Sequence, residues 1–374
     1  PPTILPVYQK NIPITVRNTF DPTAPGTLID GVKESSGPQQ IKGISSIKNV
    51  SLLTIQGIGM VGVSGISMRL FACLATREIN VILISQASSE NSISIVIDSS
   101  DTSYARQAIE EEFHREMAEE EISSIVIDDK MAVVAIVGEN MKHTTGIAGQ
   151  LFNSVGKNGV NVFAIAQGAS ELNISFVIKD RDIKKALNVI HEAFFLSDYS
   201  RLNVFIAGKG TVGSKLLNKI NAQAEKLMQE NSLKVRLVAL AGRNKMVFDN
   251  EGLDASRVID QLENEGEEGV VTDFRDRIIE MNLANSVFVD CSASEEVAAL
   301  YQSLLEANVS VVTANKIASS SSYQTYKKLK DTAREKGIKF FFETNVGAGL
   351  PIIAPINDLV RSGDNIMRLE AVLS

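Results

Sequence analysis

The chain has 374 residues, of which 44% are apolar and 22% charged, and its formal charge at pH 7 is −8. This length predicts two or three domains that each bury a core. The negative charge argues against nucleic acid or an anionic membrane surface as the main partner, and no apolar run reaches the roughly 18 residues of a bilayer-spanning helix. Two cysteines without CxxC spacing and three scattered histidines indicate neither a disulfide framework nor a zinc site.

The first 45 residues contain "NIPITVRNTFDPTAPGTLI", a strand-like run, a Pro/Gly turn and a second short strand. Alone, residues 1–45 indicate the end of a domain or a linker whose strands complete the next one. The sequence starts without Met and ends in a strand-like run, so we expect a fragment of a longer polypeptide. We expect a cytoplasmic protein, with an organellar address further upstream left open.

An internal repeat follows: residues 79–94 and 160–175 align without gaps at an offset of 81. The shared identities indicate a duplicated module. Each copy is predicted to run strand, helix, strand, strand, helix, strand, which is an α+β ferredoxin-like unit. We expect the first module over residues 46–126 and the second over residues 127–200.

These modules resemble the paired ACT regulatory modules of aspartokinases. The resemblance implies a small amino-acid effector, threonine, at the strand-to-helix loops Gly57–Gly65 and Gly138–Gly146. Backbone N–H groups at a helix start can bind a carboxylate, and a glutamine amide can bind a hydroxyl. The alternative is that each glutamine only caps the turn after its strand. The effector residues that the resemblance implies are Gln86, Gln167, Asn91, Met60 and Met141.

The same resemblance makes residues 1–45 similar to the tail of an aspartokinase catalytic domain. The residues for ATP, Mg²⁺ and aspartate would then lie upstream, so no kinase residue is assigned. Because ACT units pair their sheets across chains in that family, we expect a homodimer or a homotetramer.

From Arg201 onward the pattern alternates between strands and helices, which predicts a doubly wound Rossmann-type parallel sheet over residues 201–344. In "NVFIAGKGTVGSKLL", Gly208, Gly210 and Gly213 follow the first strand and open the first helix, the context that gives GxGxxG its meaning. Gly208 permits a tight turn, Gly210 lets a pyrophosphate approach the backbone, and Gly213 allows close helix–strand packing. Ser214-Lys215 has the reverse order of a P-loop, and a glycine turn kept for packing alone is the other alternative.

The second strand ends in "ALAGRNK", which has Arg243 and Lys245 but no acid to accept from the ribose hydroxyls. A cation there favours NADP, with NAD left open and with Arg243 pointing to solvent as the alternative. Ser292 in "DCSAS" and Lys316 in "VTANK" also follow strands and would lie at the carboxyl edge of the sheet. Lys316 could neutralise a substrate carboxylate, move a proton, or be a surface lysine. The predicted cofactor residues are Gly208, Lys209, Gly210, Thr211, Val212, Gly213, Ala241, Arg243, Ser292 and Lys316.

With "ETNVGAGLP" at residues 343–351, these motifs in this order resemble the N-terminal part of homoserine dehydrogenase. The whole chain thus resembles bifunctional aspartokinase–homoserine dehydrogenases. The resemblance implies ATP-dependent phosphorylation of aspartate and NADPH-dependent reduction of aspartate 4-semialdehyde to homoserine, with threonine feedback, in threonine, methionine and lysine biosynthesis. It makes Lys316 catalytic and implies a monovalent-cation site for Na⁺ or K⁺, built largely from backbone carbonyls. The implied cation residues are Glu343, Val346, Ala348 and Leu350.

Residues 345–374 would begin the substrate domain of such an enzyme, although "GAG" alone indicates only a tight domain-crossing turn. The family's substrate carboxylates and second catalytic lysine would lie beyond Ser374, so we expect cofactor binding without turnover. A non-catalytic amino-acid sensor with a degenerate nucleotide-binding domain is the main rival. An unrelated ACT-regulated hydroxyacid dehydrogenase is the other, but such enzymes use an active-site histidine and none follows His191.

Overall fold

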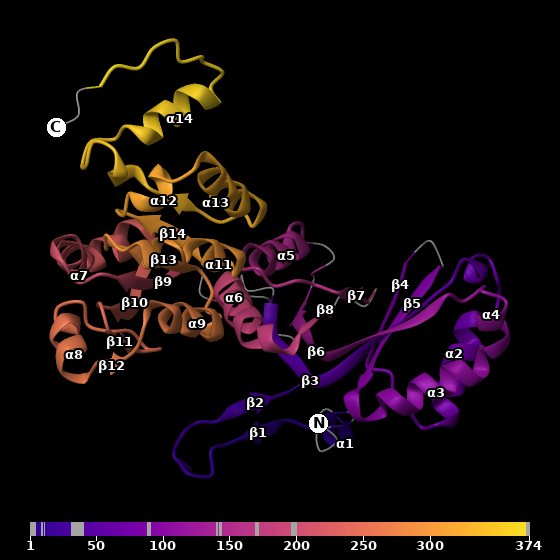
Figure 1. Cartoon of the computed structure of the whole chain (residues 1–374). Helices are drawn as coiled ribbons and strands as arrows, with labels where there is room; N and C mark the ends of the chain where they lie inside the picture. Colours follow the sequence, from indigo (N-terminus) through magenta and orange to yellow (C-terminus); the bar gives the residue numbers. More distant parts are fainter. Residues whose placement is uncertain are drawn as a thin grey trace.

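The computed structural model describes residues 5–8, 10, 12–30, 41–87, 91–139, 141, 144–168, 172–195 and 200–371. In chain order it contains a small hairpin, an antiparallel sheet with helices packed on it, and a second sheet flanked by helices (Figure 1). Within these ranges, no helix combines the length and the apolar character needed to cross a bilayer.

The N-terminal segment forms the predicted strand, turn and strand. After the short helix α1 (Leu5–Tyr8), strands β1 (Ile14–Val16) and β2 (Thr27–Ile29) pair antiparallel, with Ile14 opposite Ile29. Gly26 has φ +75°, a conformation that glycine adopts at little cost.

The two repeats fold as two similar modules. The first contains β3 (Ile41–Gln56), η1 (Ile58–Met60), α2 (Ile66–Thr76), β4 (Leu83–Gln86), β5 (Ser92–Asp98), η2 (Ser99–Asp101), α3 (Thr102–Glu112) and α4 (His114–Ala118). The second contains β6 (Ser124–Gly138), α5 (Ile147–Lys157), β7 (Ala164–Gln167), β8 (Asn173–Lys179), η3 (Asp180–Asp182) and α6 (Ile183–Phe195).

The two predicted modules share one antiparallel sheet of order β4-β5-β3-β6-β8-β7, which the sequence did not indicate. Residues 41–47 of β3 pair with the second half of β6, whereas residues 50–56 pair with β5 and with the first half of β6. The fourth strand that completes the second ferredoxin-like unit is therefore residues 41–47, the N-terminal part of β3, and not a strand after α6. The physical reason is that the strand after α6 has its partners in the other sheet.

Two left-handed residues mark the point where each long strand passes from one module to the other. Asn49 has φ 56° and Lys130 has φ 55°, and these positions are equivalent at the 81-residue offset. The edge strands also approach one another, since Ser85 Oγ donates to the Ile165 carbonyl at 3.0 Å. The sheet thus curls around an inner apolar cluster that includes Leu52, Val96, Met131, Val133 and Val177.

The C-terminal half is a seven-stranded sheet of order β12-β11-β10-β9-β13-β14-β15. Its strands are β9 (Ser200–Ala207), β10 (Leu233–Ala241), β11 (Lys245–Phe248), β12 (Glu267–Glu268), β13 (Ser286–Asp290), β14 (Ser310–Thr313) and β15 (Phe340–Phe341). Its helices are α7 (Thr211–Asn231), α8 (Val258–Glu265), α9 (Val271–Met281), α10 (Glu295–Ala298), α11 (Tyr301–Glu306), α12 (Ile317–Ser320) and α13 (Tyr323–Glu335).

This sheet is mixed, which corrects the expectation of a wholly parallel sheet. Five strands are parallel, but β11 and β12 add antiparallel at one edge. Only three residues separate β10 from β11, too few for a crossover, so the chain must return antiparallel.

Helices cover both faces of the sheet. Along β9, Val204 and Ile206 pack in one apolar cluster with Leu217 of α7 and Leu262 of α8, whereas Phe205 packs on the opposite face in the cluster that holds α9, α11 and α13. This is the doubly wound arrangement, in which ligands bind at the carboxyl ends of the parallel strands.

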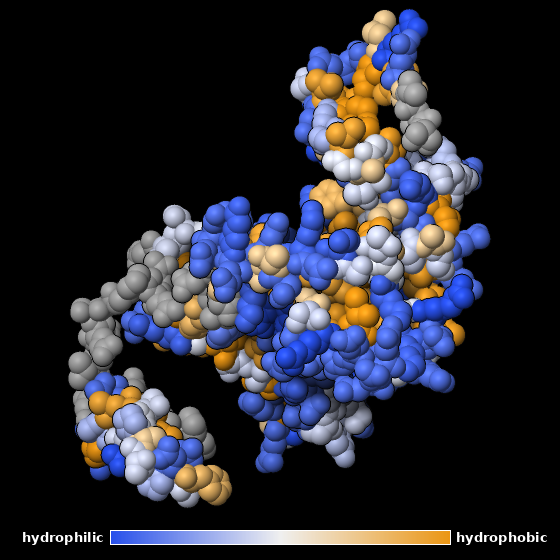
Figure 2. Space-filling view, turned by 90° about the vertical axis from the view of Figure 1, so that its left-hand side faces the viewer, coloured by the Kyte–Doolittle hydropathy of each residue, from blue (hydrophilic) through white to orange (hydrophobic). Residues whose placement is uncertain are grey.

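The chain continues through η4 (Glu343–Asn345) to α14 (Ile353–Arg361), which extends away from the sheet (Figure 1). Apolar side chains gather on this arm, at the top of Figure 2. They include Leu350, Leu359, Val360 and Met367, each more than half exposed. The arm thus presents an apolar surface within the described residues.

Candidate functional site

The glycine turn joins β9 to α7, and two of its three glycines are required by the fold. Gly208 has φ +102°, and a Cβ there would lie 2.9 Å from the Cys291 carbonyl oxygen. A Cβ on Gly213 would lie 1.9 Å from the Gly208 carbonyl oxygen, so the helix can approach the strand only without a side chain. Around Gly210, by contrast, no described protein atom lies within 4 Å of such a Cβ.

The open position at Gly210 coincides with the N-terminus of α7. Gly210 is the N-cap, with φ −69°, and the exposed Thr211 and Val212 begin the helix. The first N–H groups of a helix have no partner within it and carry partial positive charge. The turn therefore combines empty space with donors that suit a phosphate.

Cations lie on the β10 side of this turn. Gly208 N donates to the carbonyl of Ala241, the last residue of β10, at 2.8 Å. Lys209 Nζ lies 2.5 Å from Glu263 Oε1, and Lys245 Nζ donates to the Glu263 carbonyl at 2.7 Å. Glu263, on α8, was missed in the sequence because it lies 54 residues from Lys209.

Arg243 differs from these two lysines. Its side chain is exposed, and among the described residues it makes no hydrogen bond or ion pair. It is thus the cation in this group whose donors are all available to a ligand.

On the other side of the glycine turn, a buried hydrogen-bond network fixes the segment after β13. Asp290 is fully buried; its Oδ1 accepts from the Ser292 amide at 2.7 Å, and its Oδ2 accepts from Tyr301 Oη at 2.5 Å and from Asn315 Nδ2 at 3.0 Å. Burial and the Asp290 charge raise the pKa of Tyr301, so its hydroxyl stays protonated and donates. Asp290 therefore connects the Ser292 turn to the turn that follows β14.

That second turn carries Lys316. Asn315 is buried and donates to the Ser294 carbonyl at 2.8 Å, while its own carbonyl accepts from Asn345 Nδ2 at 3.2 Å. Lys316 is exposed and is the N-cap of α12. The structure thus brings Gly208, Ser292 and Lys316 to the carboxyl edge of the sheet, in the turns that follow the adjacent strands β9, β13 and β14.

Cys291 lies beneath the glycine turn. Burial, followed by the Asp290 charge, raises the pKa of its thiol to about 11. The thiol is therefore protonated at neutral pH, which disfavours it as a nucleophile.

The segment predicted to hold a monovalent cation begins at η4. The Glu343 carboxylate accepts from the backbone N–H groups of Ile352 at 2.6 Å and of Ile353 and Ala354 at 2.8 Å, so it caps the start of α14. Ala348 has φ 52°, and Val346 and Leu350 are exposed. The Glu343 carboxylate thus accepts three backbone hydrogen bonds and keeps one of its roughly four acceptor sites.

In the first ACT-like module, two of the residues implied for the effector line one cavity of about 410 Å³. Met60 and Gln86 line it together with Gly65, whose φ of +93° starts α2. Asn91 is not among the lining residues; its carbonyl accepts from the Gly57 amide at 3.0 Å.

In the second module, Gly146 repeats the φ of +93° at the start of α5. Met141 is buried and Gln167 is exposed at the end of β7. Residues 140, 142 and 143 of this loop lie outside the described residues.

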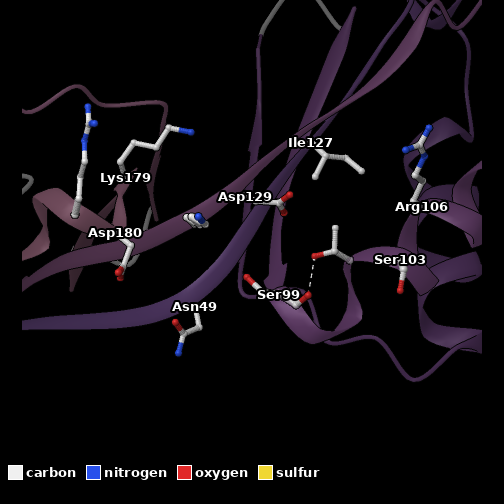
Figure 3. A pocket seen from close by; sticks show the side chains of 11 residues that line it. Asn49, Ser99, Ser103, Arg106, Ile127, Asp129, Lys179 and Asp180 are labelled. Atoms are coloured by element: carbon white, nitrogen blue, oxygen red, sulfur yellow. Dashed lines mark hydrogen bonds between the residues drawn. The ribbon is translucent and has the colours of Figure 1, made fainter.

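A larger cleft, of about 1180 Å³, lies between the two modules (Figure 3). It is lined by Ser99, Ser103 and Arg106 from η2 and α3, and by Asp129 and Lys179 from β6 and β8. None of the predicted site residues line this cleft. It is therefore neither the predicted cofactor site nor the predicted effector site, although it is larger than the cavity of Met60 and Gln86.

Comparison with known proteins assigns both halves of the chain. Residues 53–113 and 134–194 match the ACT domain family, and residues 208–343 match the family described as homoserine dehydrogenase, NAD binding domain. The bifunctional aspartokinase/homoserine dehydrogenase 1, chloroplastic, of Arabidopsis thaliana is 36% identical over all of this chain and 42% of its own length. The bifunctional enzyme of Haemophilus influenzae is 35% identical over all of this chain and 46% of its own length.

Among solved structures, the aspartate kinase of Clostridium acetobutylicum aligns with 51% of this chain and 44% of its own, at 32% identity and a TM-score of 0.45. The chain spans less than half the length of the bifunctional relatives named above.

Tandem ACT domains followed by a nicotinamide-dinucleotide-binding domain define the class of this protein. Over its whole length the chain corresponds to the region of bifunctional aspartokinase/homoserine dehydrogenases that carries these domains.

Proposed function

We propose that this chain is the regulatory and cofactor-binding part of an enzyme that reduces aspartate 4-semialdehyde to homoserine with NADPH. The same polypeptide would phosphorylate aspartate with ATP and Mg²⁺ through residues outside this chain. The observation that carries the proposal is the open position at Gly210, on the N-terminus of α7 and beside the Ser292 and Lys316 turns.

The residues at the carboxyl edge of the seven-stranded sheet would each have a role. Gly210 and the α7 N-terminus would take the pyrophosphate, and the guanidinium of Arg243 would bind the 2′-phosphate. The bound dinucleotide would supply a hydride to the aldehyde carbon. The Lys316 ammonium would donate a proton to the forming alkoxide, giving the alcohol.

The ACT domains would bind threonine, with the cavity of Met60 and Gln86 as the site in the first domain. A monovalent cation would be held by carbonyls around Val346 and Ala348. Assembly as a homodimer or homotetramer would follow from pairing of ACT sheets across chains.

A cofactor titration tests the dehydrogenase proposal. NADPH and NADH fluorescence should show tighter NADPH binding by the wild-type protein. Arg243→Asp should weaken NADPH binding about tenfold or more and spare NADH, because charge-assisted hydrogen bonds to the 2′-phosphate are lost. Arg257→Asp is the matched control, since Arg257 is 85% exposed on the same domain.

Two results would count against this reading. Equal NADPH affinity in Arg243→Asp would place the 2′-phosphate elsewhere. No binding of either nucleotide would favour an amino-acid sensor with a degenerate nucleotide-binding domain.

A further inference from the structure

A further polar cavity, of about 220 Å³, lies where α6 of the second ACT domain meets the seven-stranded sheet. It is lined by His191 and Glu192 of α6, Arg201 and Asn203 of β9, and Arg236 of β10. These residues lie near the starts of β9 and β10, so the cavity is at the amino edge of the sheet, opposite the glycine turn.

Strand pairing places the two arginines together. Asn203 pairs with Arg236 across β9 and β10, and Arg201 lies two residues before Asn203, on the same face. Arg236 Nε donates to Asn203 Oδ1 at 2.7 Å, and Asn203 is only 3% exposed. The guanidinium of Arg236 is thus held in place with its remaining donors unused by that bond.

Neither guanidinium in this cavity has a direct ion-pair partner among the described residues. Among the described residues, no carboxylate oxygen lies within 4.0 Å of either guanidinium. Glu192 lines the cavity, but its Oε1 accepts from the backbone N–H of Arg201 and its Oε2 from Asn285 Nδ2 at 3.4 Å. Burial, and then repulsion by the charge of Arg201, lower the pKa of Arg236, and the charges of Glu251 and Asp249 offset this only in part.

We propose that this cavity binds a small oxyanion between the guanidinium groups of Arg201 and Arg236. Phosphate and carboxylate share the required chemistry, because a guanidinium fork donates two parallel hydrogen bonds to either. The volume accommodates such an anion with a few waters, each of which takes roughly 30 Å³. The bound anion would link the second ACT domain to the strands that run to the proposed dinucleotide site.

Calorimetric titration with sodium phosphate and with sodium acetate, each against NaCl at equal ionic strength, tests the proposal and separates the two anions. Arg201→Gln should weaken binding of the favoured anion about tenfold or more. Arg257→Gln, in an exposed arginine of the same domain, should leave it unchanged. Arg243→Gln and Gly210→Ala should also leave it unchanged, and together they exclude phosphate bound at the glycine-turn edge.

Thermal unfolding gives a second readout, because loss of Arg201 should raise Tm without anion but reduce the gain in Tm that the anion produces. Without anion, Arg201→Gln should raise Tm, because one of two like charges is removed; with phosphate in excess, the wild-type protein should gain more Tm than the variant. Arg236→Gln loses the bond to Asn203 as well, so Arg201→Gln is the deciding variant. A Tm that falls in Arg201→Gln without anion, or phosphate binding equal to wild type, would overturn the proposal.

Discussion

Alanine at Gly213 and at Gly210 should have opposite consequences, because the two glycines face different surroundings. At Gly213 the added Cβ would lie 1.9 Å from the Gly208 carbonyl oxygen, where contacts under 3.0 Å essentially never occur. The helix or the turn must therefore move by about 1 Å. Overpacking against rigid backbone costs about 1–3 kcal/mol, and with this contact we expect the upper half of that range. Tm should fall by roughly 4–10 °C for a domain of this size.

At Gly210 the same methyl group meets no described protein atom within 4 Å, and its φ of −69° suits any L-residue. Stability should stay within about 0.5 kcal/mol of wild type or rise slightly, because alanine restricts the unfolded chain. The methyl occupies the space through which a pyrophosphate would reach the α7 N-terminus. NADPH affinity should therefore fall about tenfold or more.

Thermal unfolding of the wild type and both variants, each with and without NADPH, measures the two effects together. Gly213→Ala should lower Tm without nucleotide, whereas Gly210→Ala should lose only the stabilisation by NADPH. Equal loss of Tm in both variants would refute the packing argument. Wild-type NADPH binding by Gly210→Ala would refute the pyrophosphate position.

Tyr301→Phe removes a donor from buried Asp290 and should destabilise the protein by about 1–3 kcal/mol in calorimetry, whereas Tyr323→Phe, in a residue 73% exposed, should have no effect. Arg69 holds the pKa of Glu116 below its usual 4.5 by a hydrogen bond, so the ionised carboxylate stabilises the fold above pH 4.5, and this contribution disappears as pH falls through the lowered value. Glu116→Gln should therefore flatten the acid limb of a stability–pH curve, and an unchanged limb, or the same flattening in exposed Glu119→Gln, would contradict this. Gln86→Ala and Gln167→Ala in the full-length protein should each weaken threonine inhibition and spare catalysis; an inhibition curve that does not move removes that glutamine from the effector site.

Local patterns carried most of the fold prediction. The hairpin, the duplicated modules and the β9–α7 turn each follow from residues close in sequence, whose periodicity reports helix or strand directly. The alternating pattern of a strand does not identify its partner, and for this reason the sharing of β3 between the two ACT domains was missed. Strand β11 was missed because four residues after a three-residue turn give almost no periodic signal.

The candidate site shows the same division. The glycine motif and the turns at Ser292 and Lys316 were expected at one sheet edge because parallel strands end together. The network that connects those turns was not expected, because Tyr301 and Asn315 join Asp290 from 11 and 25 residues away and Tyr301 reads as part of an apolar helix face. A side-chain hydrogen bond between distant residues leaves no periodic trace in the sequence.

The joint between the second ACT domain and the dinucleotide-binding domain consists mainly of hydrogen-bonded turns. Asn282, Asn285 and Asn308 all have positive φ; they bond to Asp182 Oδ1, Asn158 Oδ1 and the Lys157 carbonyl, respectively.

Such polar contacts resemble a transient interface more than a domain core, so a change in orientation costs less here than within either sheet. Because β9 runs from this joint to the glycine turn, a reorientation of α6 can reach the proposed cofactor edge only if β9 or its neighbours shift as a unit. Asp290 bonds to both the Ser292 turn and Asn315, so a shift of β13 at that edge would move the turns after β13 and β14 together.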